Sequence, residues 1–139
     1  MDKQDVIAFK KELENYSYYK TNLEGTKKLI EYNEYLLSNL HGIDPSREPS
    51  GSSGSIPWVE TESFRRIADE LDRLNKRKVL REAQIEHIEN VLNAMDSKIK
   101  DICIEIYLDG KSYREVASNR GISSTSLFRT IEEELKEIL

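Results

Sequence analysis

Cysteine, proline and glycine are scarce in this sequence, and their scarcity narrows the choice of fold. The chain of 139 residues has one cysteine, three prolines and six glycines. A single cysteine, Cys103, cannot form a disulfide within the chain, and its neighbours Ile102, Ile104 and Ile106 indicate a buried apolar residue rather than a reactive thiol. An all-β fold needs many turns, and turns are usually marked by proline and glycine, which are scarce in this chain. The composition therefore predicts an all-α fold.

The sequence also lacks membrane and secretion signals and an excess of positive charge. No apolar run approaches the roughly 20 residues of a membrane span, and the charged start MDKQD is unlike a signal peptide. We therefore expect a cytoplasmic protein without membrane contact. Acidic residues outnumber basic ones by 26 to 21, for a net charge of −5. Such a chain should have a weak non-specific affinity for nucleic acid. It can still bind DNA at one site, because the local charge of the contact surface governs that binding.

Patterns typical of catalysis or metal binding are missing as well. His41 and His87 stand alone, with no cysteine or histidine at ligand spacing, which counts against a zinc site. The stretch GSSGS lacks the lysine and the preceding strand of a phosphate-binding loop. We therefore expect no enzyme, no cofactor and no metal.

The first 42 residues are predicted to form an N-terminal helical unit. Val6, Phe9 and Leu13 recur at helical spacing and form one apolar stripe. The segment from Asn22 to Gly25 is either a short break or a tolerated kink. Five tyrosines lie in this unit: Tyr16, Tyr18, Tyr19, Tyr32 and Tyr35. Tyr16 is expected to pack within the chain, while the other four suit either internal packing or a protein interface.

Residues 43–57 are dominated by serine, glycine and proline, which predicts a flexible linker. Residues 58–95 are predicted to form a long helix that serves as a scaffold or for oligomerisation. Its apolar residues follow a heptad spacing: Ile67, Leu71, Leu74, Ile85, Ile88, Leu92 and Met95. This stripe, interrupted at Lys78 and Arg81, could pack on the N-terminal helix or pair with a second subunit, which makes a homodimer a candidate. The basic run RLNKRKVLR, residues 73–81, is either a solvated face or a strip that contacts phosphates.

Residues 96–139 carry the start and stop signals of three helices. Asp96 or Ser97 caps the first, which ends at Gly110. Ser112 caps the second, with a glutamate three residues later as in a capping box, and Gly121 ends it. Ser123 caps the third helix. Its apolar core stripe repeats at helical spacing: Leu127, Ile131, Leu135 and Ile138.

The last two of these helices fit a helix-turn-helix, although an ordinary antiparallel helix pair has the same spacing. In a helix-turn-helix the second helix enters the major groove by its N-terminal end. Hydroxyls and a guanidinium there can bond base edges or phosphates, and a phenyl ring can touch a thymine methyl. The candidate DNA-binding residues are Ser112, Arg114, Ser123, Ser124, Thr125, Phe128 and Arg129, with Lys111 and Arg120 as candidate phosphate contacts.

The segment from about Ile85 to Leu139 resembles region 4 of sigma-70-type factors. The resemblance rests on the stretch IYLDGKSYREVASNRGISSTSLFRTIEEELKEIL, and these residues carry it: Tyr107, Gly110, Ser112, Glu115, Val116, Ala117, Gly121, Ile122, Ser123, Leu127 and Arg129. With its tyrosine-rich start ELENYSYYKTNLE, the whole chain resembles phage late-transcription regulators of the RinA, LtrC and ArpU type. The resemblance implies promoter binding in a bacterial host cell, activation of late packaging genes, and host RNA polymerase as a candidate partner.

The end of the last helix departs from this pattern. Beyond Arg129 it reads EEELKEIL, so its later turns are acidic and only its first two turns would meet DNA. Acidic charge also suits a protein partner. Two alternatives therefore stay open: a module that binds RNA polymerase or another regulator without DNA, and a DNA-recognition subunit of a packaging machine of the small-terminase kind.

Overall fold

The computed structural model describes residues 3–41 and 58–139, and all regular structure in these two stretches is helical. No strand occurs within them, which confirms the predicted all-α fold. The linker predicted for residues 43–57 lies outside the described part of the chain. None of the helices in the described residues has the length and apolar character needed to cross a bilayer.

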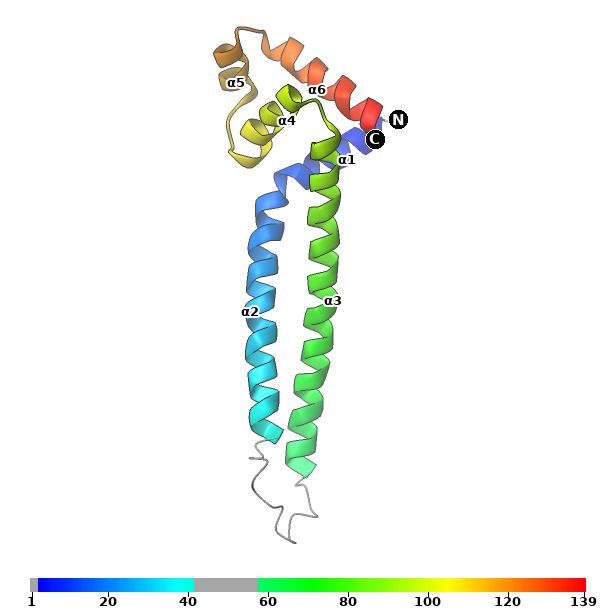
Figure 1. Ribbon diagram of the computed structural model, residues 1–139, viewed down its shortest axis with the longest axis vertical. Coiled ribbons are helices and arrows are strands. Elements are labelled where there is room, and N and C mark those ends of the chain that lie inside the picture. Colours follow the sequence, from blue (N-terminus) through cyan, green and yellow to red (C-terminus); the bar gives the residue numbers. More distant parts are fainter. Residues whose placement is uncertain (1–2, 42–57) are drawn as a thin grey trace. The chain divides into compact units, whose positions relative to one another are not determined.

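Within each of the two described stretches the helices follow one another with short connections (Figure 1). In chain order they are α1 (Lys3–Glu14), α2 (Tyr16–His41), α3 (Trp58–Ala94), α4 (Ser97–Cys103), the π-helical η2 (Ile104–Leu108), α5 (Tyr113–Arg120) and α6 (Ser124–Ile138).

The chain forms two compact units whose boundaries cut through the two long helices. One, here called the helix-pair unit, is Asn22–Arg81, and the other, the terminal unit, joins Met1–Thr21 to Glu82–Leu139. The segments expected from the sequence divide the chain differently, because 1–42 and 58–95 each contribute to both units. The start of α2 and the end of α3 belong to the terminal unit because their apolar residues lie in its core.

The N-terminal helical stretch is interrupted at Asn15, ten residues before Gly25. The backbone N–H of Asn15 is shared between the carbonyls of Lys11 and Glu12, each 3.1 Å away. Gly25 lies inside α2, where the helix continues without a break. Of the two alternatives for the segment from Asn22 to Gly25, the short break is therefore excluded.

The terminal unit has an apolar core built from all its helices. Its α6 packs against α1, α4 and α5, while η2 packs against α1 and α5. The buried apolar side chains are Val6, Phe9, Leu13, Tyr19, Ile85, Ile88, Val91, Leu92, Met95, Ile102, Cys103, Ile106, Val116, Ala117, Leu127, Ile131 and Leu135. At about 25 cal/mol per Å² of apolar area, burial on this scale is the main stabilising contribution to the unit.

The helix-pair unit sets parts of α2 and α3 side by side (Figure 1). Leu74, one of the predicted heptad positions, is fully buried on α3, and it is joined by Leu23 and Ile30 from α2. Polar side chains also connect the two helices: the Arg77 Nε–H donates to the Thr26 hydroxyl oxygen over 2.9 Å.

A second arginine of the basic run, Arg81, donates from Nε to the Asn22 Oδ1 over 2.8 Å. On the exposed face of α3, Arg73 pairs with Glu70, and Lys76 pairs with Asp72 at 3.0 Å. Arg73 and Lys76 are thus balanced on an exposed face, as the solvated-face interpretation expects, whereas Arg77 and Arg81 are half-buried and bond to α2.

Candidate nucleic-acid interface

The turn between α5 and α6 is built by local hydrogen bonds that its sequence supplies. Gly121 ends α5 with φ of +71°, a left-handed conformation that side chains disfavour. The N–H of Ile122 then donates to the carbonyl of Ala117 over 3.0 Å. The Ser123 hydroxyl accepts from the Ser126 N–H over 3.1 Å and caps α6. The start of α6 is therefore fixed, and the predicted cap is confirmed.

The orientation of α6 follows from its apolar stripe. Leu127, Ile131 and Leu135 are 0% exposed, as the spacing predicts. Because these three residues turn inward, Thr125 and Arg129 lie on the exposed side of the helix, and so do Ser123 and Ser124. In the part of the chain that the structure describes, Arg129 forms no ion pair. The hydroxyls and the guanidinium at the head of α6 thus form one accessible surface.

Aromatic rings connect this surface to the rest of the terminal unit. The Phe128 ring, 48% exposed, lies 5.9 Å from the Tyr113 ring, and the Tyr113 ring lies 6.2 Å from Tyr107 in an edge-on arrangement. The two tyrosine hydroxyls are hydrogen-bonded to each other. Burial raises the pKa of both phenols, so they are neutral at physiological pH.

A shallow depression lies beside these rings at the start of α6. Tyr113 and Phe128 supply its apolar wall, and Ser124 and Thr125 supply its polar rim. An apolar surface edged by hydroxyls suits a thymine methyl group or a small apolar side chain of a protein partner.

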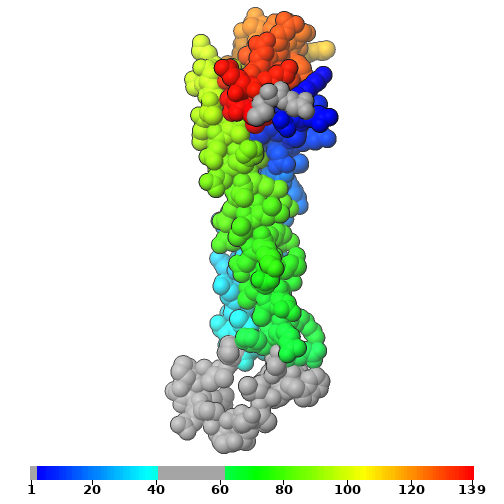
Figure 2. Space-filling view, turned by 90° about the vertical axis from the view of Figure 1, so that its right-hand side faces the viewer, coloured from blue at the N-terminus to red at the C-terminus, as the bar shows by residue number. Residues whose placement is uncertain are grey.

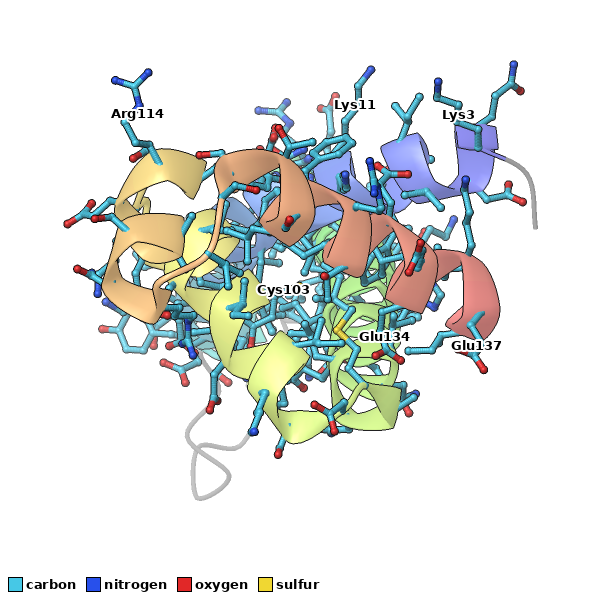
Figure 3. The ribbon with its side chains drawn as sticks, turned by 90° about the horizontal axis from the view of Figure 1, so that it is seen from above. Lys3, Lys11, Cys103, Arg114, Glu134 and Glu137 are labelled. Carbon is cyan, nitrogen blue, oxygen red and sulfur yellow. The ribbon has the colours of Figure 1, made fainter. Side chains whose placement is uncertain are left out.

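The start of α5 adds two of the predicted residues. The Ser112 hydroxyl accepts from the Glu115 N–H over 3.0 Å and caps the helix. Arg114 is exposed and points away from the body of the unit (Figure 3). Ser112 therefore has a structural role as a cap, while Arg114 is placed to reach a ligand.

The two predicted phosphate contacts, Lys111 and Arg120, converge on Glu105 of η2. The Arg120 Nη2 lies 2.6 Å from one Glu105 oxygen, and the Lys111 Nζ lies 3.1 Å from the other. The hydrogen bond from Arg120, followed by that from Lys111, holds the pKa of the Glu105 carboxyl below its usual range. Glu105 therefore pairs with both cations and balances one of their two positive charges, and a phosphate would have to compete with it.

Sequence reasoning missed Glu105, and it also missed Lys10 on α1. The Lys10 Nζ lies 4.1 Å from the centre of the Phe128 ring and forms an ion pair with Glu132, the first acidic residue after the head of α6. Both paired side chains are largely buried, with 13% and 15% exposure. The available signal for Lys10 was its place directly after Phe9 in the buried stripe of α1; no local signal points to Glu105.

Two of the acidic side chains of α6 point away from the predicted contact surface. Glu134 and Glu137 lie on the side of the terminal unit opposite to Arg114 (Figure 3). Glu133 is exposed on the same face of the helix as Arg129, one turn further along, and Lys10 balances Glu132. The negative charge of this helix is thus concentrated away from its first turns.

Cys103 lies in the core beneath α6, fully buried (Figure 3). Burial raises the pKa of its thiol to about 12, so the reactive thiolate is scarce at neutral pH. The prediction of a buried cysteine is confirmed. Residues 3–41 and 58–139 hold no cluster of histidine, cysteine, aspartate and glutamate that could bind a metal ion.

In comparisons with protein-family models, curated proteins and solved structures, no match to this chain was found.

Proposed function

We propose that the protein is a sequence-specific DNA-binding transcription regulator in which α5, the turn and α6 act as a helix-turn-helix. The observation that carries the proposal is the head of α6: Ser124, Thr125 and Arg129 are exposed while three apolar residues of the same helix are fully buried. Such a helix can offer its N-terminal side chains to base edges without disturbing the core.

The chemistry of these side chains suits DNA. An arginine can make two hydrogen bonds to guanine or bind a phosphate, and hydroxyls bond either. The half-exposed Phe128 supplies an apolar contact for a thymine methyl. Arg114 is exposed at the start of α5, the first helix of the pair, which in this class of motif crosses the DNA backbone. The overall charge of −5 then serves specificity, because it weakens binding to unrelated sequences.

The resemblance to RinA-, LtrC- and ArpU-type regulators supports a finer version of the proposal. In that version the protein acts in the bacterial cytoplasm, binds phage late promoters and activates packaging genes, with host RNA polymerase as its protein partner.

Selection of bound duplexes from a random-sequence library tests DNA recognition directly. The wild-type protein should enrich a defined sequence. Arg129→Ala should bind that sequence about 5- to 150-fold more weakly, as expected for one lost base contact of about 1–3 kcal/mol. Lys136→Ala, on the acidic half of the same helix, is the matched control and should bind nearly as well as wild type.

Circular dichroism should show unchanged helix content in both variants, since both side chains are exposed. If the library yields no enriched sequence, the protein is not a sequence-specific DNA binder. If a sequence is enriched and Arg129→Ala binds it normally, the contact surface is assigned to the wrong side chains.

A second candidate function is a module that binds a protein without contacting DNA. The exposed acidic end of α6, with Glu133 and Glu137, together with the apolar depression at Tyr113 and Phe128, favours it. Capture of purified RNA polymerase by the protein in nuclease-treated samples, combined with no enrichment from the library, would select this candidate.

A further inference from the structure

We propose that α1 is part of the DNA interface, and that its exposed Lys3 and Lys11 contact backbone phosphates on the strand beside the groove entered by α6. This inference rests on the proposed function, and it adds a phosphate-binding element from the opposite end of the chain. It also gives Lys10, between the two helices, the role of a positioning residue.

The helix α1 packs against α6. Val6, Phe9 and Leu13 bury one face of α1 in the core. On the flank of this face, Lys10 connects to α6 through the Phe128 ring and Glu132. The surfaces of α1 (blue) and α6 (orange to red) adjoin in the space-filling view (Figure 2). Lys10, near the end of α1, therefore lies beside Phe128 and Glu132, and the start of α1 lies beside the end of α6, where Asp5 and Leu139 line one depression (Figure 1).

The other lysines on α1 point to a common side of the terminal unit. Lys3 precedes Lys10 by seven residues, which is nearly two helical turns, so both lie on the same flank of the helix. Lys11 follows Lys10 and lies about 100° further around the helix. Lys3, Lys11 and Arg114 point to the same side of the terminal unit, and Glu134 and Glu137 lie on the opposite side (Figure 3).

The cations on this side of the unit differ from other cations in whether they form ion pairs. Lys3, Lys11, Arg114 and Arg129 are all exposed, and within the described residues none of them forms an ion pair. They differ in this from Lys111 and Arg120, which are paired with Glu105. Exposed cations without a carboxylate partner are available to replace the counterions of phosphates.

Lys10 neutralises a negative charge at the edge of this surface. Glu132 is the acidic residue that follows the head of α6 most closely in sequence, and an uncompensated carboxylate there would repel the DNA backbone. The ion pair with Lys10 removes most of that repulsion. Phosphate contacts of this kind fix the register of a protein on the duplex and leave the reading of sequence to the base contacts.

The salt dependence of binding tests the inference, because each phosphate contact adds about 0.9 to the slope of log K against log salt. We would use the duplex enriched from the random library and a scrambled duplex of equal length. For Lys3→Ala/Lys11→Ala the slope should fall by about 1.8 on both duplexes. Affinity should fall about fivefold per lysine at 0.15 M salt, which follows from the same slope.

Lys98→Ala is the matched control for Lys11→Ala, since it removes an exposed lysine from another helix of the same unit. Its slope should equal that of wild type. In Lys10→Ala the slope should change little while affinity falls, and affinity should return in Lys10→Ala/Glu132→Gln. Recovery in the double variant separates the electrostatic role from a loss of folding.

The two proposals fail in different ways. If the wild type enriches a sequence and Arg129→Ala loses it, but Lys3→Ala/Lys11→Ala keeps the wild-type slope, α1 is outside the DNA interface and the inference is overturned. An equal fall in slope for Lys98→Ala would also overturn it, because the effect would then reflect net charge alone. If the wild type enriches no sequence, the proposed function fails, and the inference fails with it.

Discussion

The terminal unit and the helix-pair unit differ in what they bury between their helices. The terminal unit packs leucine, isoleucine, valine and aromatic side chains from every one of its helices. The helix-pair unit buries Leu23, Ile30 and Leu74 in the described residues, and adds the fully buried hydroxyl group of Thr26 with an arginine directed onto it. Apolar burial stabilises strongly and without direction, whereas a hydrogen bond contributes about 1 kcal/mol net and fixes one alignment.

This difference suits different tasks. The dense core of the terminal unit holds α6 in one orientation, as the proposed contact with DNA would require. In the helix-pair unit the bonds of Arg77 to Thr26 and of Arg81 to Asn22 specify which residues of α2 and α3 lie opposite each other. A wrong alignment would leave these polar groups without partners, at a cost of about 1–3 kcal/mol each.

The helix-pair unit also exposes more of its large apolar side chains: Leu29, Tyr32, Tyr35, Phe64, Val79 and Leu80. Some of these suit a protein interface, and a homodimer through the long helices stays a prediction. Sedimentation of the full chain would measure the number of subunits.

The largest expected effect comes from the apolar core of the terminal unit. Leu127→Ala should lower the free energy of unfolding by about 3 kcal/mol, because it leaves a cavity beneath α6. Leu80→Ala, at a leucine that is 53% exposed in the helix-pair unit, is the control and should change it by less than about 0.5 kcal/mol. Urea denaturation followed by circular dichroism measures both, and equal effects would show that Leu127 does not anchor the helix.

A smaller effect should come from the polar contact of the helix-pair unit. The Thr26 hydroxyl donates to the Asn22 carbonyl over 2.7 Å and accepts from Arg77. Thr26→Val keeps the shape but removes the acceptor, so we expect a loss of about 1–2 kcal/mol. Thr130→Val is the control, because the exposed Thr130 hydroxyl makes the same kind of bond to the Ser126 carbonyl, over 2.9 Å.

Hydrogen exchange should localise the effect of Thr26→Val to α2 and α3 of the helix-pair unit. Faster exchange confined to α6 would contradict the separate packing of the two units. A loss as large for Thr130→Val as for Thr26→Val would show that the helix-internal bond, and not the arginine contact, is the stabilising one.

The smallest effect concerns a hydrogen bond at the edge of the terminal unit. The Tyr16 hydroxyl donates to the Glu89 Oε2 over 2.7 Å, as internal packing of this tyrosine predicts. Burial, followed by the Glu89 carboxylate, raises the pKa of Tyr16 to about 12. The unfolded chain loses this proton near pH 10, so between these values the folded state binds more protons. The free energy of unfolding should therefore fall as pH rises from about 10 to 12.

Absorbance of the tyrosinate ion during a pH titration measures this shift. The difference between wild type and Tyr16→Phe should appear late in the titration, near pH 12 and not near pH 10. An early transition for Tyr16 would mean that its bond to Glu89 does not form in solution.

The sequence by itself determined the local structure of the last 44 residues to a large extent. Asp96, Ser112 and Ser123 cap their helices as expected, and Gly110 and Gly121 adopt positive φ where the helices end. These outcomes were predictable because caps and glycine turns depend on bonds between residues two to five apart. The buried stripe of α6 was predictable for a similar reason, since helical periodicity alone sets which side chains share a face.

Only the tertiary structure decided which charges are available at the candidate interface. Lys111 and Arg120 look equivalent to Arg114 and Arg129 in the sequence, yet the first two are paired with Glu105. Lys10 and Glu132 meet across 122 positions of the chain, and Asn15, not the region of Gly25, interrupts the N-terminal stretch. Periodicity places a side chain on a face of its own helix but carries no information about what another helix brings to that face, and ion pairs depend on that meeting.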